Sequence, residues 1–152
     1  MDNEIKRIRS FQLFEIAEDM LADGQSVIIT VVGNSMYPFL RNKVDSVELY
    51  RESYDNIRVN DIVVGRIGKR YILHRVYKKY DDKFIMLGDG NFSTDGPYLR
   101  ENLICKASAI YRKDKRISCN SLSFKFLSIV WKLLKPFRAK IFKVYFKIRG
   151  KK

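Results

Sequence analysis

Short apolar segments divide the sequence between residues 26 and 112, and this pattern most restricts the folds open to the chain. The clearest segment, 26–32, reads SVIITVV and is rich in β-branched residues. Further strand candidates cover 44–50, 61–67, 70–77, 83–87 and 103–112. Turn residues such as Asp81, Asp82 and the stretch 88–91 separate them. Many short strands after one helix predict a mainly β fold built on a curled, mostly antiparallel sheet.

One helix is expected ahead of these strands, over residues 4–22. Its apolar positions recur every three or four residues: Ile5, Ile8, Phe11, Phe14, Ala17 and Leu21. Gly24 is suited to end the helix, because glycine readily adopts the left-handed conformation of a C-terminal cap. The length of 152 residues is enough for one core-forming domain. We expect that domain to cover residues 1–120.

The positive charge is concentrated at the C-terminal end. The formal net charge is +13, but residues 1–120 hold 20 Lys and Arg against 17 Asp and Glu. Residues 121–152 hold 10 Lys and Arg and no acid. A near-neutral domain therefore precedes a basic tail, whose natural partner is a negatively charged surface, either lipid or nucleic acid.

The tail reads as two amphipathic helices interrupted at Pro136. Polar positions fall at helical spacing, at Lys125, Ser128, Lys132 and Lys135 and then at Lys140, Lys143 and Lys147. The apolar arc between them is aromatic-rich: Phe124, Phe126, Trp131, Phe137, Phe142, Tyr145 and Phe146. We expect residues 122–149 to contact an anionic membrane surface, as interfacial helices do. One alternative is packing of the helices on the domain. The other is nucleic-acid binding, which the sequence favours least.

The rest of the composition bears on location. No apolar run approaches the roughly 18–20 residues of a membrane-spanning helix, and residues 1–10 carry no apolar core of a secretory signal. Two cysteines, Cys105 and Cys119, are too few for a disulfide scaffold. We therefore expect a cytoplasmic protein, peripheral on the inner face of the membrane.

Two residues form a candidate nucleophile and base. Ser35 follows the first strand candidate, directly after Gly33 and Asn34, where backbone N–H groups are nearby. His74 is the only histidine and lies in an apolar strand candidate, followed by Arg75. An imidazole with a pKa near neutrality is the usual acceptor of a serine proton. Taken alone, the serine would be an ordinary turn residue and the histidine a structural one.

A third element supplies carboxylates. The segment 88–96 reads GDGNFSTDG, so Asp89 and Asp95 lie in one loop after a strand candidate. A carboxylate that accepts the second N–H of a histidine fixes its tautomer and stabilises its charged form. Turn formation alone would also explain the Asp-Gly-Asn sequence.

Together, these elements resemble a known family. The succession Ser35-Met36-x-Pro38, then His74-Arg75-Val76, then Gly88-Asp89-x-Asn91 with Asp95 beyond, is similar to the type I signal peptidase superfamily, which includes the self-cleaving SOS repressors. The resemblance covers about residues 26–112. Many relatives have lysine at the position of His74. Histidine there resembles the archaeal, endoplasmic-reticulum and sporulation-type branch, and the opening segment resembles a compact stand-alone bacterial subgroup.

The resemblance implies a serine endopeptidase and a signal-peptidase-like curled sheet. Ser35 would be the nucleophile and His74 the base, with either Asp95 or Asp89 orienting His74 and the other carboxylate pairing with Arg75 or bracing the loop. The N–H of Ser35 would be one donor to the oxyanion, with either other backbone groups or Asn34 completing the oxyanion hole. Ser93 is a lesser candidate for a hydrogen bond to the base.

The resemblance also indicates how a substrate would bind. Met36, Pro38 and Asn34 would shape the turn and the substrate cleft. The substrate would be an extended peptide or precursor protein, added as a strand. No cofactor or metal is expected. The alternatives are a catalytically inactive relative that binds peptides or a membrane surface, and a nucleic-acid-binding protein.

Overall fold

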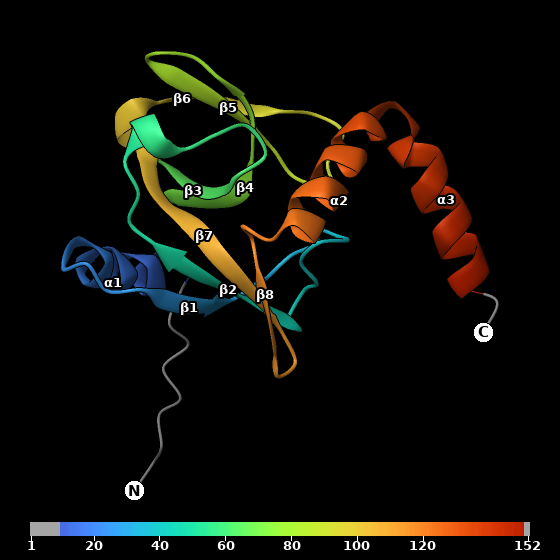
Figure 1. The fold of residues 1–152 in the computed structure, drawn as a ribbon, viewed down its shortest axis with the longest axis horizontal. Helices are drawn as coiled ribbons and strands as arrows, with labels where there is room; N and C mark the ends of the chain where they lie inside the picture. The colour runs from blue at the N-terminus through green and yellow to red at the C-terminus, as the bar shows by residue number, and fades with distance from the viewer. Residues whose placement is uncertain (1–9, 151–152) are drawn as a thin grey trace, which may run out of the picture.

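The computed structural model describes residues 10–150, which form a curled β-sheet with one helix before it and two after it (Figure 1). The helices are α1 (Ser10–Ala22), α2 (Leu122–Leu133) and α3 (Arg138–Arg149). The strands are β1 (Val27–Thr30), β2 (Asp45–Tyr50), β3 (Ile62–Ile67), β4 (Arg70–Lys79), β5 (Lys83–Leu87), β6 (Asp95–Leu99), β7 (Leu103–Arg112) and β8 (Lys115–Ser118). Single 3₁₀ turns occur at Tyr54–Asn56, Arg100–Asn102 and Lys135–Phe137.

The six predicted strands are confirmed, and two strands were not predicted. Strand β6 reads DGPYL, and its Gly and Pro are typical of turns rather than strands. Strand β8 reads KRIS and pairs with β7 across a tight turn at Lys113. Both extra strands take their conformation from a neighbouring strand, which local propensity does not reveal.

The sheet is antiparallel at each strand pair, in the order β1-β2-β7-β3-β4-β5-β6, with β8 on the side of β7. Register shifts interrupt the pairing in β2, β3, β4 and β5. Such bulges bend a strand and increase its twist, so the sheet curls into an open half-barrel. The predicted mainly β class and curled antiparallel sheet are therefore confirmed.

Two apolar clusters hold the sheet. The larger one joins α1, the β1–β2 end and α2, and includes Leu21, Met36, Leu40, Leu49 and Phe124. The smaller one fills the curl of the other half: Tyr54, Ile57, Val63, Val76, Phe84, Met86 and Tyr98. Because the two halves bury separate clusters, the strand β4 that joins them is fixed on both faces.

Helix α1 ends as predicted. Gly24 has φ +78°, and the N–H of Gln25 donates to the carbonyl of Met20 at 3.0 Å, which closes the last turn. The beginning of the predicted helix, residues 4–9, lies outside the described residues.

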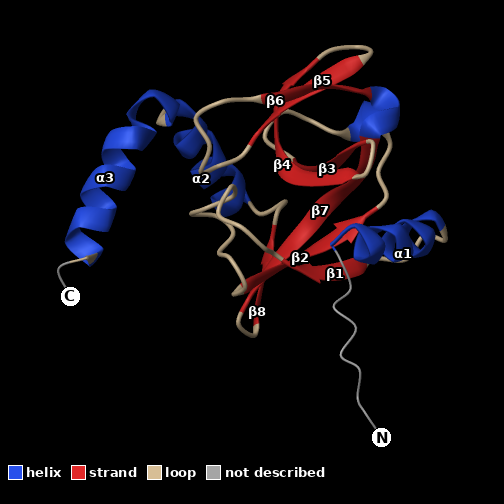
Figure 2. Cartoon of the chain, turned by 180° about the vertical axis from the view of Figure 1, so that it is seen from behind, coloured by secondary structure: helices blue, strands red, loops and turns tan. Residues whose placement is uncertain are grey.

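The C-terminal helices differ in how they meet the sheet. Helix α2 packs on it through Phe124, which is buried in the larger cluster, and α3 turns back from the end of α2 and extends away from the strands (Figure 2). The break at Pro136 is confirmed, since the chain changes direction in Lys135–Phe137. Among residues 10–150, no helix has both the length and the apolar character that crossing a bilayer requires.

Candidate functional site

Ser35 lies half-buried in the loop between β1 and β2, and two buried residues anchor that loop. Met36 is 2% exposed and Leu40 is fully buried, and both belong to the larger core cluster. The N–H of Leu40 donates to the carbonyl of Met36 at 2.9 Å. The side-chain amide oxygen of Asn42 accepts the N–H of Gly33 at 2.9 Å. The serine is therefore held on a short, fixed turn.

A buried carboxylate braces the same loop. Asp45, fully buried at the start of β2, accepts hydrogen bonds from the guanidinium groups of Arg41 and Arg112 at 2.9 Å each. Arg112 also donates to the carbonyl of Phe39 at 3.0 Å. Although burial acts against ionisation, these bonds hold the pKa of Asp45 below its ordinary value.

His74 and Asp95 form the closest polar pair of the site. Nδ1 of His74 lies 2.6 Å from Oδ2 of Asp95. The two residues come from β4 and β6, and β5 lies between these strands. The side chain of His74 is 6% exposed and that of Asp95 is 33% exposed. An ionised Asp95 accepts the Nδ1–H of His74, which leaves Nε2 as the basic nitrogen.

Burial lowers the pKa of His74 below its ordinary value, although Asp95 and Asp89 act in the opposite direction. The imidazole is consequently neutral at physiological pH. A neutral imidazole with Nδ1–H engaged is the form that accepts a proton at Nε2.

Gly88 lies where the serine loop and the imidazole meet. A β-carbon at Gly88 would collide with the carbonyl oxygen of Ser35 and would lie 2.9 Å from Nε2 of His74. The N–H of Gly90 donates to that same carbonyl at 2.8 Å. Within residues 10–150, Oγ of Ser35 makes no hydrogen bond to His74. In unliganded sites this bond is often long and tightens only with substrate.

Asp89 has a different partner. Its carboxylate accepts Nε–H of Arg75 at 2.8 and 2.9 Å, and both side chains are almost fully buried. Arg75 also donates to the carbonyl of Asn60 at 2.9 Å and stacks on Phe39 at 4.4 Å. Burial raises the pKa of Asp89, against the influence of Arg75. Of the two carboxylates that could orient His74, Asp95 is therefore the one that contacts it, whereas Asp89 pairs with Arg75.

Two tail residues hold the loop 88–91, and the sequence pattern did not assign them to the site. The indole Nε1–H of Trp131 donates to the carbonyl of Asp89 at 2.9 Å. Arg138, 2% exposed, donates to the carbonyls of Asn91 and Trp131 at 3.4 and 3.2 Å. The sequence pattern placed Trp131 on the apolar arc and gave Arg138 no role, and only the way α2 and the start of α3 pack brings both side chains to this loop.

The remaining predicted residues surround the serine. Asn34 is exposed, and its carbonyl accepts the N–H of Tyr37 at 3.1 Å. Pro38 lines an apolar groove between the serine loop and α2, whereas Met36 is core and shapes the turn rather than a substrate surface. Ser93 is exposed in the loop before Asp95.

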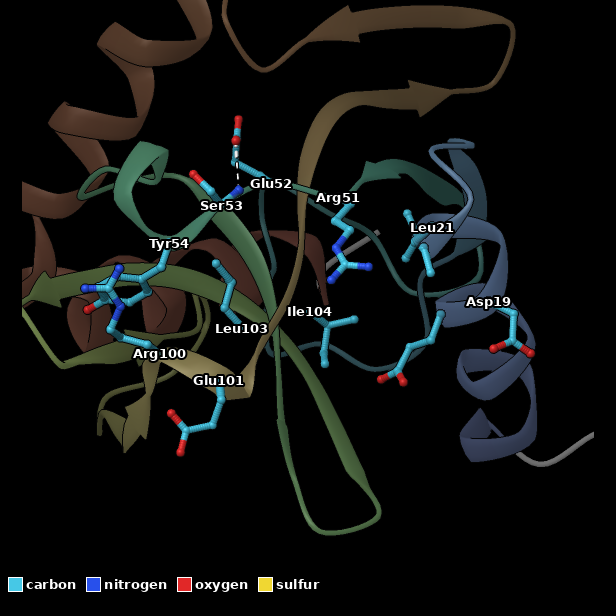
Figure 3. A pocket seen from close by; sticks show the side chains of 12 residues that line it. Asp19, Leu21, Arg51, Glu52, Ser53, Tyr54, Arg100, Glu101, Leu103 and Ile104 are labelled. Carbon is cyan, nitrogen blue, oxygen red and sulfur yellow. Dashed lines mark hydrogen bonds between the residues drawn. The ribbon is translucent and has the colours of Figure 1, made fainter.

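A larger pocket lies elsewhere, between α1 and the turns at Tyr54–Asn56 and Arg100–Asn102 (Figure 3). It encloses about 550 Å³ and is lined by acidic and basic side chains, among them Glu18, Arg51, Glu52, Arg100 and Glu101. The side chain of Glu52 accepts the N–H of the neighbouring Ser53 at 2.9 Å. None of its lining residues belongs to the set around Ser35 and His74.

The chain was also compared with known proteins. No family model matches the sequence. No curated protein matches it significantly. The site therefore has to be interpreted from its own chemistry.

Proposed function

We propose that this protein is a serine endopeptidase in which Ser35 is the nucleophile, His74 the general base and Asp95 the residue that orients His74. One observation carries the proposal: the 2.6 Å hydrogen bond between His74 and Asp95 directs Nε2 toward Gly88, against which the Ser35 backbone also lies. A serine loop, an oriented neutral imidazole and a carboxylate in this order form the usual arrangement for acyl transfer.

The chemistry follows from these positions. Oγ of Ser35 attacks the carbonyl carbon of a peptide bond while its proton moves to Nε2 of His74. The charged imidazole is stabilised by Asp95 and returns the proton to the leaving amine. Water then hydrolyses the acyl-serine by the same route. The N–H of Ser35 is a candidate donor to the oxyanion, since it makes no hydrogen bond within residues 10–150.

The proposed substrate is an extended peptide or a precursor protein. Such a segment binds by adding a strand to an edge of the sheet. Its backbone then forms hydrogen bonds that do not depend on its sequence. The apolar groove beside Pro38, about 370 Å³ in volume and lined by Phe39, Leu127 and Trp131, offers a place for an apolar side chain of that segment.

A serine-reactive fluorophosphonate probe tests the proposal without knowledge of the substrate. We expect labelling of the wild type at Ser35 and loss of labelling in Ser35→Ala and His74→Ala, since nucleophile and base act as a unit. Ser53→Ala, from the larger pocket, is the matched control and should label like the wild type. Circular dichroism would show that the variants are folded. A folded wild type that resists the probe would favour the alternative, a non-catalytic module that binds peptides.

A further inference from the structure

Helix α2 has large side chains on two opposite faces. The inner face contains Phe124 and Ser128, both buried, and Trp131, which reaches the loop at Asp89. The outer face is a stripe with the helical spacing four, three and four, and it is also apolar. Its residues and their exposed fractions are Leu122 (86%), Phe126 (66%), Ile129 (49%) and Leu133 (71%).

This arrangement corrects the expected polar face of α2. Ser128 is buried and donates to the carbonyl of Phe124 at 2.7 Å. Lys132 and Lys135 turn toward the sheet, where their ammonium groups lie 5.7 and 4.4 Å from the ring centre of Tyr77. The side of α2 that points away from the domain is therefore apolar, although a helix packed on one side would normally expose polar residues.

Apolar side chains are also exposed beyond α2. Phe137, in the turn between the helices, and Val144 and Ile148 on α3 are each more than half exposed. A group of apolar residues as extensive as this marks an interaction surface. We call the exposed residues Leu122, Phe126, Ile129, Leu133, Phe137, Val144 and Ile148 the outer face.

Charge distinguishes the possible occupants of the outer face. Lys125, Lys140, Lys143 and Lys147 are exposed on the same two helices, and residues 121–152 contain no acid. A second copy of this chain would bring equal positive charge to the contact and be repelled. An anionic lipid surface offers both an apolar phase and negative headgroups, and lysine stems lie along such a boundary with their charge in water.

We propose that the outer face docks on an anionic bilayer surface, with α2 and α3 at the interface and not across it. Docking would also hold the serine loop near the lipid. Tyr37, two residues after Ser35, packs against Phe142, Tyr145 and Phe146 of α3 with ring centres 6.1 to 6.3 Å apart. Lipid binding does not require the catalytic chemistry proposed above, so each is tested separately.

Flotation of the full chain with phosphatidylcholine vesicles, with and without phosphatidylglycerol, tests the inference. We expect strong binding to the anionic vesicles and much weaker binding to phosphatidylcholine alone. High salt should lower the first toward the second without abolishing it, because salt screens the attraction between charges and not the apolar contribution. Phe126→Ser with Leu133→Ser should remove the salt-resistant binding. Ile16→Ser is the matched control and should leave binding unchanged, since Ile16 is 56% exposed on α1, on the other side of the sheet from α2 and α3 (Figure 1).

A second pair of variants tests the charge. Lys143→Gln with Lys147→Gln should weaken binding at low salt by roughly fivefold for each charge removed. Lys113→Gln with Lys115→Gln should leave it unchanged; these two exposed lysines lie in the turn after β7 and at the start of β8. Circular dichroism of each variant separates a loss of binding from a loss of folding.

Three outcomes would overturn the inference. The first is absence of binding to anionic vesicles at low salt. The second is equal loss of binding in the outer-face and the control variants. The third is a different occupant: lipid-independent dimers in sedimentation that Phe126→Ser and Leu133→Ser dissociate, or binding to a short duplex DNA at salt concentrations where vesicles are not bound.

Discussion

Two neighbouring residues of β4, His74 and Arg75, each pair with a carboxylate from the segment 88–95, and the two pairs differ in exposure. Consecutive residues of a strand point to opposite faces, so the pairs lie on different sides of the sheet. Asp95, the partner of His74, is one-third exposed, whereas Asp89, the partner of Arg75, is 2% exposed.

This difference separates a pair that can transfer a proton from one that cannot. An arginine stays charged at all accessible pH values, so the buried Arg75–Asp89 pair can only hold charge and geometry. Histidine changes its charge near neutrality, and its partner at the rim of the site can support either form. Two aspartates from one short segment therefore have different roles. Asp89 stabilises the fold through Arg75, whereas Asp95, in the proposed peptidase, supports proton transfer by His74.

The largest effect on stability is expected from Asp89→Asn. Removing this carboxylate leaves Arg75 buried without a counter-charge, beside the equally buried Arg138. Breaking one partner of a buried ion pair costs about 3–5 kcal/mol. The free energy of unfolding from urea denaturation should fall by that amount. A value unchanged within about 1 kcal/mol would show that the pair contributes little to the fold.

Asp95→Asn should act in the opposite way, with a large effect on activity and a small effect on stability. The amide cannot fix the Nδ1–H tautomer of His74 or stabilise its charged form, so the rate of probe labelling should fall by roughly 100-fold or more. Since Asp95 is one-third exposed, its loss should cost no more than about 1–2 kcal/mol in urea denaturation. If the Asp95→Asn variant is labelled at the wild-type rate, Asp95 has no part in the proposed mechanism.

Much of this contrast could be predicted from the sequence. The strand segments, the Ser35 turn and the placement of His74 on a strand follow from local patterns of apolar and turn residues. The choice between Asp89 and Asp95 could not be made, because it depends on β6, whose DGPYL sequence has little strand propensity. Only the sheet order, with β5 between β4 and β6, brings Asp95 to His74.

The tail shows a second limit of sequence patterns. Periodicity identified both helices and the break at Pro136, but it cannot show which face of a helix meets the domain. Trp131 belonged to an apolar arc and Ser128 to a polar face. In the structure Ser128 is buried and Trp131 donates to the carbonyl of Asp89. The direction of approach of α2 is a tertiary property, set by Phe124 in the core.

The pH profile of labelling gives a more sensitive test of the His74–Asp95 pair. Because burial lowers the pKa of His74, labelling should fall to half at a pH below about 6.5, the ordinary value of histidine. Asp95→Asn removes an influence that raises this pKa, so its midpoint should move to still lower pH. Asp89→Asn, which alters the Arg75–Asp89 pair instead, should move the pH midpoint less. A midpoint above pH 8 would mean that His74 is not the base.

The same lowered pKa affects folding. Below about pH 6.5 the unfolded chain binds a proton at His74 more readily than the folded chain does, so stability should decrease as the pH falls through this range. In His74→Ala this contribution is absent. The difference between the two denaturation series, measured from pH 7.5 to 5, isolates it.

The smallest effect is expected from the hydrogen bond that joins α2 to the loop 88–91, between Trp131 and the carbonyl of Asp89. Trp131→Phe keeps an aromatic ring against Phe142 and removes only the N–H that donates to the carbonyl of Asp89. Losing one hydrogen bond of this kind costs about 1 kcal/mol, and labelling should slow by less than tenfold. If the loop 88–91 transmits this change to His74, the pH midpoint should move together with the rate. Phe126→Leu, on the exposed side of the same helix, is the control and should label like the wild type. An unchanged rate and midpoint in Trp131→Phe would mean that α2 covers the loop without positioning the base.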